Sequence, residues 1–183
     1  MTIKSFKQYI TEVENITYSS DKGVILNHLN NEKDLKEYDA EHISTTASGH
    51  KLYKYKYHGK TSYHAVNPET KSIDMGIEGK EKNDVLHKPL IMANHGNTIK
   101  AHDFLHHLIT KHDKTIVVDK MSAGGKSAFQ KLQNEHGKEV NIHGWHKGSP
   151  VNIHMGDEDY MHGDKDNADE KEAKETLMVA HKK

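Results

Sequence analysis

The chain has 183 residues, of which 33% are hydrophobic and 29% charged, with 26 basic residues, 27 acidic residues and no cysteine. This length suits one domain with a small core, and the lack of cysteine excludes disulfides, thiolate nucleophiles and zinc–thiolate sites. Every basic residue is a lysine, which argues against nucleic acid as a partner. The sequence has no run of about 18 apolar residues, so we predict no membrane partner.

The first residues carry apolar side chains at helical spacing, namely Ile3, Phe6, Tyr9, Ile10 and Val13. Spacing alone predicts a short amphipathic helix that packs on the domain. The sequence of residues 4–12, KSFKQYITE, resembles the capsid-targeting leaders of proteins packaged inside the heads of large tailed phages. Those leaders end in a Leu/Ile-x-Glu site that is cut by the prohead protease.

Ile10, Thr11 and Glu12 match that protease site. The resemblance implies cleavage after Glu12 and a location in the phage head interior, followed by delivery to the host cytoplasm. It also implies the prohead protease as a partner. We therefore expect residues 1–12 to be a capsid-targeting peptide and not part of the fold.

The elements that follow begin with a weak helix over residues 30–40 and a turn over residues 44–49. Alternating patterns then predict three strands in an antiparallel meander, over residues 52–57, 61–66 and 71–77. A fourth apolar run covers residues 85–93. It contains Pro89, which cannot donate a ladder hydrogen bond and so predicts a sheet edge or a bulge.

In the second half, one apolar face predicts a helix from residue 98 to residue 112, and a short buried strand follows over residues 115–118. Ser122 is placed to cap a second helix that ends near residue 135. A strand from Val140 and a turn at residues 146–150 predict a hairpin with residues 151–154. An acidic turn over residues 156–167 and a C-terminal helix over residues 169–181 complete the prediction.

The run TIVVDKMSAGGK at residues 115–126, together with Leu132 and VNIHGW at residues 140–145, resembles the second half of phage-encoded GNAT acyltransferases. The resemblance spans residues 51–154 and implies an α/β (α+β) fold, with a GNAT-like domain at residues 13–155 and a tail at residues 156–183. It also implies acetyl-CoA as cofactor, with its pyrophosphate in the loop after the fourth strand. The loop residues concerned are Met92, Ala93, Asn94, His95, Gly96, Asn97, Thr98 and Lys100.

The loop departs from the family's R/Q-x-x-G-x-G/A motif. If Gly96 is its first glycine, Thr98 stands at the second glycine position, where a Cβ crowds phosphate, and Lys100 replaces the small residue. In the family a tyrosine after the second helix acts as acid, which points to Tyr160, and a carboxylate acts as base, for which Asp119 is the candidate. Each also has a non-catalytic interpretation, Tyr160 as a surface residue and Asp119 as a turn or helix-start residue.

Two further patterns have alternative interpretations. His102 and His106 lie at i and i+4, a spacing that suits a metal-dependent hydrolase, yet in a chain with 17 histidines we predict two solvated side chains and no metal. Tyr53, Tyr55 and Tyr57 alternate along a strand, which is more typical of a core than of a nucleic-acid stacking platform.

The sequence therefore predicts a phage virion-internal protein whose GNAT-like acetyltransferase domain acts on a host protein. The first alternative is an inactive GNAT-like binding protein or host-defence inhibitor. The second alternative is the metal-dependent hydrolase.

Overall fold

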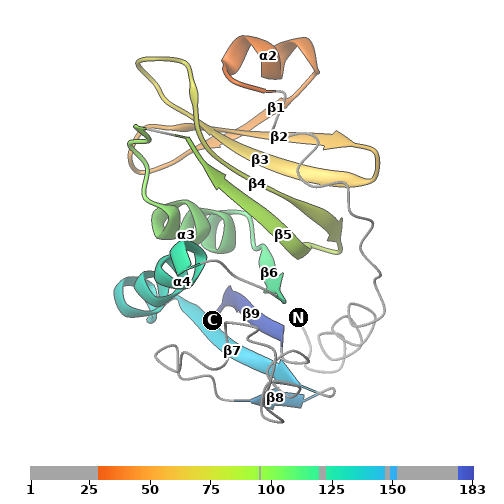
Figure 1. Cartoon of the computed structure of the whole chain (residues 1–183), viewed down its shortest axis with the longest axis vertical. Helices are drawn as coiled ribbons and strands as arrows, with labels where there is room; N and C mark the ends of the chain where they lie inside the picture. The colour runs from red at the N-terminus through yellow and green to blue at the C-terminus, as the bar shows by residue number, and fades with distance from the viewer. Residues whose placement is uncertain (1–28, 95, 120–122, 147–148, 152–176) are drawn as a thin grey trace.

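The computed structural model describes residues 29–94, 96–119, 123–146, 149–151 and 177–183, and these form an α+β fold (Figure 1). They contain a nine-stranded sheet of order β1-β2-β3-β4-β5-β6-β9-β7-β8. The sheet is antiparallel except for the pair β5 and β6. The strands are β1 (Glu41–Thr45), β2 (Lys51–Tyr57), β3 (Lys60–Val66), β4 (Ile73–Lys82), β5 (Val85–Ala93), β6 (Thr115–Val118), β7 (Val140–His146), β8 (Ser149–Val151) and β9 (Leu177–Lys182), and the helices are α2 (Glu32–Glu37), α3 (Ala101–Lys111) and α4 (Ala123–His136).

Helices α3 and α4 cover one face of the sheet, and the main core lies beneath them (Figure 1). Phe104 of α3 and Phe129 of α4 are fully buried there against strand residues such as Ile77 and Ile116. The opposite face carries a smaller cluster in which Leu35 of α2 packs against strands β2 to β4. The apolar stripe of each helix therefore packs against one face of the sheet, as expected for amphipathic helices.

Most elements agree with the sequence prediction, including β5, β6, α3 and α4. The meander is longer than predicted, because β1 adds a strand before β2 and pairs with it from Glu41 to Thr45. This segment is polar, and its pattern predicts only a turn that begins at residue 44. Strand β1 lies at the edge of the sheet, where a strand needs one apolar face at most, and only Ile43 packs against the core.

The predicted C-terminal helix is wrong at its end, because residues 177–182 form strand β9. Strand β9 lies inside the sheet between β6 and β7, and its first four residues are all buried. A strand with both faces covered shows no polar alternation, so its pattern cannot be distinguished from that of a helix. Residues 156–176, including Tyr160, lie outside the described residues, as do residues 1–12.

Pro89 lies at a bulge and not at an edge. The register between β4 and β5 shifts between Glu78 and Lys80, and Lys88 has a positive φ of 45°. A Cβ at Gly79 would lie 2.9 Å from the carbonyl oxygen of His87, so only glycine fits opposite the bulge. The bulge is therefore built by residues of both strands.

The tyrosines of β2 face α2, and only the first is buried. Tyr53 is 4% exposed, while Tyr57 is 43% exposed. The hydroxyl of Tyr53 donates a 2.6 Å hydrogen bond to Glu32, and this bond is the main reason that the pKa of Glu32 falls to about 2. The expectation that this row lines a core holds for Tyr53 and fails for Tyr57.

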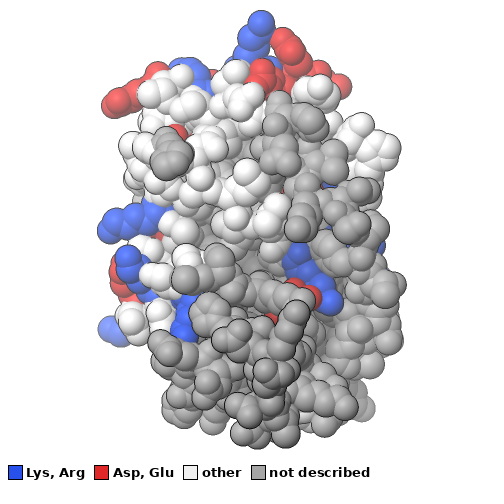
Figure 2. All heavy atoms as spheres, viewed as in Figure 1, with Lys and Arg blue, Asp and Glu red and all other residues white. Residues whose placement is uncertain are grey.

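Lysine and acidic side chains lie next to one another at the end of the molecule that carries α2 (Figure 2). Two pairs on α2 show the same mixing, Lys33 with Glu37 at 3.6 Å and Lys36 with Glu32 at 3.2 Å. On the face that Figure 2 shows, the charges of α2 are therefore mixed in sign, unlike the extended basic patch typical of a nucleic-acid interface. None of the helices in the described segments has the length and apolarity needed to cross a membrane.

His64 of β3 is a buried histidine with little hydrogen bonding. Its side chain is inaccessible to solvent, its Nε2 atom lies 2.9 Å from the hydroxyl of Ser62, and its Nδ1 atom has no partner among the described residues. Burial lowers the pKa of His64 to about 4.

This shift predicts a loss of stability in mild acid. The unfolded chain takes up a proton near pH 6.5 and folded His64 only near pH 4, so the free energy of unfolding falls as the pH decreases between these values. We expect His64→Gln to remove up to one proton from that dependence, about 1.4 kcal/mol per pH unit. Urea unfolding across this range measures both slopes, and equal slopes would show that folding leaves the pKa of His64 unchanged.

Candidate functional site

The loop between β5 and α3, residues 94–100, is fixed by the carboxylate of Asp74 on the neighbouring strand β4. Its Oδ2 atom accepts hydrogen bonds of 2.9 Å from both the backbone amide and the hydroxyl of Thr98. The side-chain amide of Asn67 donates to the same oxygen at 3.1 Å, and Nε2 of His50 lies 3.0 Å from it. One buried oxygen therefore joins the loop to β4, to the residue after β3 and to the residue before β2.

The hydrogen bonds decide the charge state of Asp74. Burial raises the pKa of this carboxyl, but the bonds from Thr98, His50 and Asn67 outweigh burial and hold the pKa below its usual value. Asp74 is thus a carboxylate at neutral pH, although its residue is only 5% exposed. A buried charge of this kind is tolerated because its oxygen is fully hydrogen-bonded.

The backbone of the loop is also bonded to β4 and within itself. The amide of Asn94 donates to the carbonyl of Asp74 at 2.9 Å, and the amide of Asn97 donates to the carbonyl of Asn94 at 3.2 Å. Gly96 has a φ of +78°, which favours glycine at this turn. With the amide of Thr98 bonded to Asp74, the amides of residues 97 and 98 are already committed within the protein.

A pocket of about 370 Å³ lies between this loop, the first turn of α3 and the first half of α4. Lys100 and Lys131 line it, and none of the described lining residues is acidic. Lys100 is the N-cap residue of α3, and its side chain makes no capping hydrogen bond. Because Lys100 and Ala101 line the pocket, the N-terminus of α3, which is the positive end of the helix dipole, lies at the pocket. The pocket therefore suits a negatively charged group.

Strands β5 and β6 separate below the loop. They pair in parallel only between residues 85–87 and 115–117, whereas β5 continues to Ala93. The separation begins at the bulge of Lys88, whose ammonium lies 3.2 Å from the carboxylate of Asp119 at the end of β6. The space between the two strands is therefore bordered by an ion pair.

The structure brings together only some of the site residues predicted from the sequence. Four of the loop residues, Ala93, Asn97, Thr98 and Lys100, line the pocket, while Met92, Asn94 and Gly96 do not. Asp119 is not among the lining residues either. His95, Tyr160 and the protease site at Ile10, Thr11 and Glu12 lie outside the described residues.

Sequence reasoning missed Asp74, His50, Asn67 and Lys131. Asp74 could have been suspected, because an acid between Ile73 and Met75 in a short apolar strand must be exposed or paired. His50, Asn67 and Lys131 carry no local signal, since their roles depend on the pairing of distant segments.

The prediction of solvated histidines on α3 is wrong for His102, which is only 3% exposed. Its Nε2 atom lies 3.1 Å from the carboxylate of Glu135 on α4. His106, one turn further along α3, lies 3.4 Å from Glu139. Both histidines therefore face acidic groups near the end of α4.

Comparison with known proteins adds no relationship, since no family model, curated protein or solved structure matches the chain. The site must be interpreted from its own geometry.

Replacing the central carboxylate tests the loop network. Asp74→Asn removes the charge that accepts four contacts, and we expect the free energy of unfolding at pH 7 to fall by about 1–3 kcal/mol. Because folding lowers the pKa of Asp74, its contribution is present above about pH 4 and is lost as the pH falls through the lowered value. Urea unfolding should therefore show a difference between variant and wild type that shrinks in acid.

Glu69→Gln, in the exposed turn after β3, is the matched control and should change stability by less than about 0.5 kcal/mol. An equal effect of the two substitutions would contradict a central role for Asp74.

Proposed function

We propose that the chain is a phage virion-internal protein whose GNAT-like domain binds acetyl-CoA at the loop between β5 and α3 and acetylates a host protein. The observation that carries this proposal is the lysine-lined pocket at the start of α3. The resemblance of residues 4–12 to capsid-targeting leaders supports a location in the phage head. The order of elements and the pocket of the domain support acetyl transfer.

The order of elements supports the GNAT-like assignment. An antiparallel meander ends in β5, helix α3 crosses to the parallel strand β6, and α4, β7 and a final strand β9 follow. The resemblance predicts this succession as far as one strand after α4, and it does not predict β9. It also predicts a cleft for the cofactor where the fourth and fifth strands part, and β5 and β6 part after three residue pairs.

The pocket supports a ligand that carries phosphate. A pyrophosphate needs positive charge and hydrogen-bond donors, and Lys100, Lys131 and the start of α3 supply them. Asn97 and Ser127 add neutral polar groups to the lining. For the transfer itself, Asp119 and Tyr160 remain the candidate acid–base residues, and the carboxylate of Asp119 lies 3.2 Å from the ammonium of Lys88.

One observation favours the second candidate, an inactive GNAT-like protein that binds and inhibits a host protein. The amide of Thr98 is bonded to Asp74, so it does not face a phosphate, and the Asp74 carboxylate adds negative charge behind the loop. In this alternative the Asp74 network takes the place that the cofactor's phosphates have in an active enzyme.

Titration calorimetry with acetyl-CoA separates the two candidates. We expect binding that weakens about tenfold in Lys100→Ala and in Lys131→Ala, because each removes a charge-assisted contact. Lys111→Ala, at the other end of α3, is the matched control and should bind as the wild type does. Absence of binding by the full chain would remove the acetyltransferase proposal and favour the inhibitor.

The leader proposal has its own test. Protein isolated from phage particles should begin at Val13, and deletion of residues 1–12 should abolish packaging while leaving the melting temperature nearly unchanged. Mass spectrometry of particles and thermal unfolding of the deletion variant measure these outcomes. A large fall in melting temperature would mean that these residues belong to the fold.

A further inference from the structure

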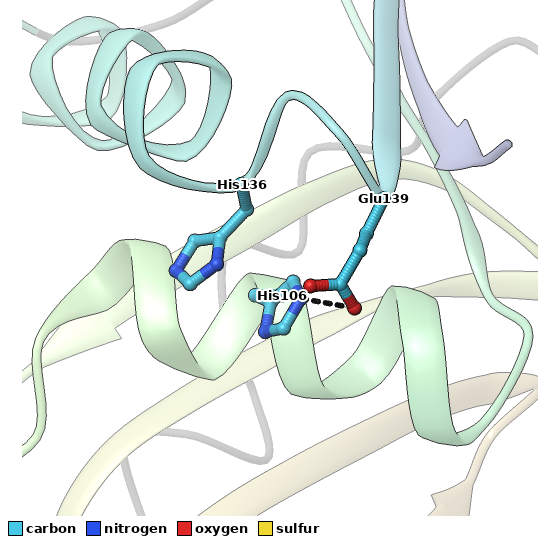
Figure 3. A group of neighbouring side chains, drawn as sticks. All are labelled: His106, His136 and Glu139. Atoms are coloured by element: carbon cyan, nitrogen blue, oxygen red, sulfur yellow. Dashed lines mark hydrogen bonds and ion pairs between the residues drawn. The ribbon is translucent and has the colours of Figure 1, made fainter.

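Three metal-ligating side chains meet where α3 passes the end of α4 (Figure 3). His106 comes from the middle of α3, His136 is the last residue of α4, and Glu139 precedes β7. Each offers one donor atom, and the three donor atoms lie within 4.8 Å of one another. We call these residues the His106 group.

The two imidazoles of the group lie face to face, with ring centroids 3.8 Å apart and an angle of 12° between the rings. The carboxylate of Glu139 lies 3.4 Å from Nε2 of His106, as the dashed line in Figure 3 marks. Both histidine side chains are 21% exposed and that of Glu139 is 62% exposed. The group is therefore held by the fold and is open to solvent on one side.

The backbone positions of the group are set by packing. Leu105 and Leu108 beside His106, and Leu132 one turn before His136, are fully buried in the main core. The amide of Glu139 donates to the carbonyl of His136 at 2.9 Å, which fixes the turn between them. Ligands held on packed elements in this way need only side-chain rotation to close on an ion.

The charges around the group suit a divalent cation. Oδ1 of Asp103 lies 3.4 Å from Nε2 of His136, so a second carboxylate accompanies that of Glu139. Two carboxylates balance the charge of one divalent ion, while two neutral imidazoles supply nitrogen donors. Nitrogen and carboxylate oxygen donors together favour zinc and similar borderline ions over calcium or magnesium.

We propose that His106, His136 and Glu139 bind a Zn²⁺ ion, with a water molecule at the open fourth position. Zinc bonds of about 2.0–2.1 Å require donors roughly 3.3 Å apart in a tetrahedral site. The donors of the group must approach one another, and because a metal ion lies in the plane of each imidazole that binds it, at least one of the two partly exposed rings must turn out of the stack. The bound ion joins α3 to the connection between α4 and β7, a role independent of the proposed acetyl-CoA site.

The converging carboxylates distinguish this group from ordinary surface histidines. Among the described residues only one other set of metal-ligating side chains comes as close, namely His102, Asp103 and Glu135. That set holds a single imidazole, and its histidine is only 3% exposed. The His106 group, with two imidazoles and an open side, is therefore the better zinc site.

The test uses the full chain, stripped of metal with a chelator and titrated with Zn²⁺ against a chromophoric competitor. We expect one tight equivalent, whose affinity falls at least tenfold in His106→Gln, in His136→Gln and in Glu139→Gln. His42→Gln and His58→Gln, which replace exposed histidines outside both groups, are the matched controls and should retain the tight equivalent.

Thermal unfolding gives a second readout. At free Zn²⁺ about 100-fold above the dissociation constant, the melting temperature of the wild type should rise by about 5–10 °C, and the rise should shrink by about half or more in Glu139→Gln. Because Glu139 is mostly exposed, this variant should fold normally without metal. Absence of a tight equivalent, or equal weakening in the control variants, would overturn the proposal.

Discussion

The carboxylate of Asp74 is the interaction on which the candidate site depends. It is buried between the sheet and the loop, and its charge is compatible with burial only because Thr98, Asn67 and His50 bond to it together. Those bonds fix the point where β5 ends and α3 begins. The position of α3 in turn sets the lysine-lined pocket at its first turn and the His106 group further along it.

The sequence predicted well those elements whose patterns are local. Strands β5 and β6 and helix α3 have long apolar runs or one clear apolar face, so their positions followed from periodicity. It failed at β1, a polar edge strand, and at β9, whose buried residues beginning at Leu177 follow a lysine- and glutamate-rich segment typical of helices. In both cases pairing with a distant strand overrides the local preference.

The candidate site was only partly predictable for the same reason. The order of elements placed the loop, and Thr98 and Lys100 were recognised there. Asp74 lies on β4 and His50 directly precedes β2, and their contact with Thr98 depends on the register of the sheet. Likewise, His106 showed only a helical spacing to His102, whereas its partner Glu139 comes from beyond the next helix. Constellations assembled from several elements leave no mark at fixed sequence spacing.

The central place of β9 has a consequence for biosynthesis. Val118 of β6 pairs with Met178, although α4 and β7 lie between them in the chain, and β7 joins the sheet only through β9. During translation the ribosome therefore releases two separate halves of a sheet, each with an open edge, before residues 177–182 emerge to join them. Open edges of this kind favour association with other chains. Completion of the sheet must therefore await the emergence of residues 177–182, and until then the edges of β6 and β7 that β9 later covers are open.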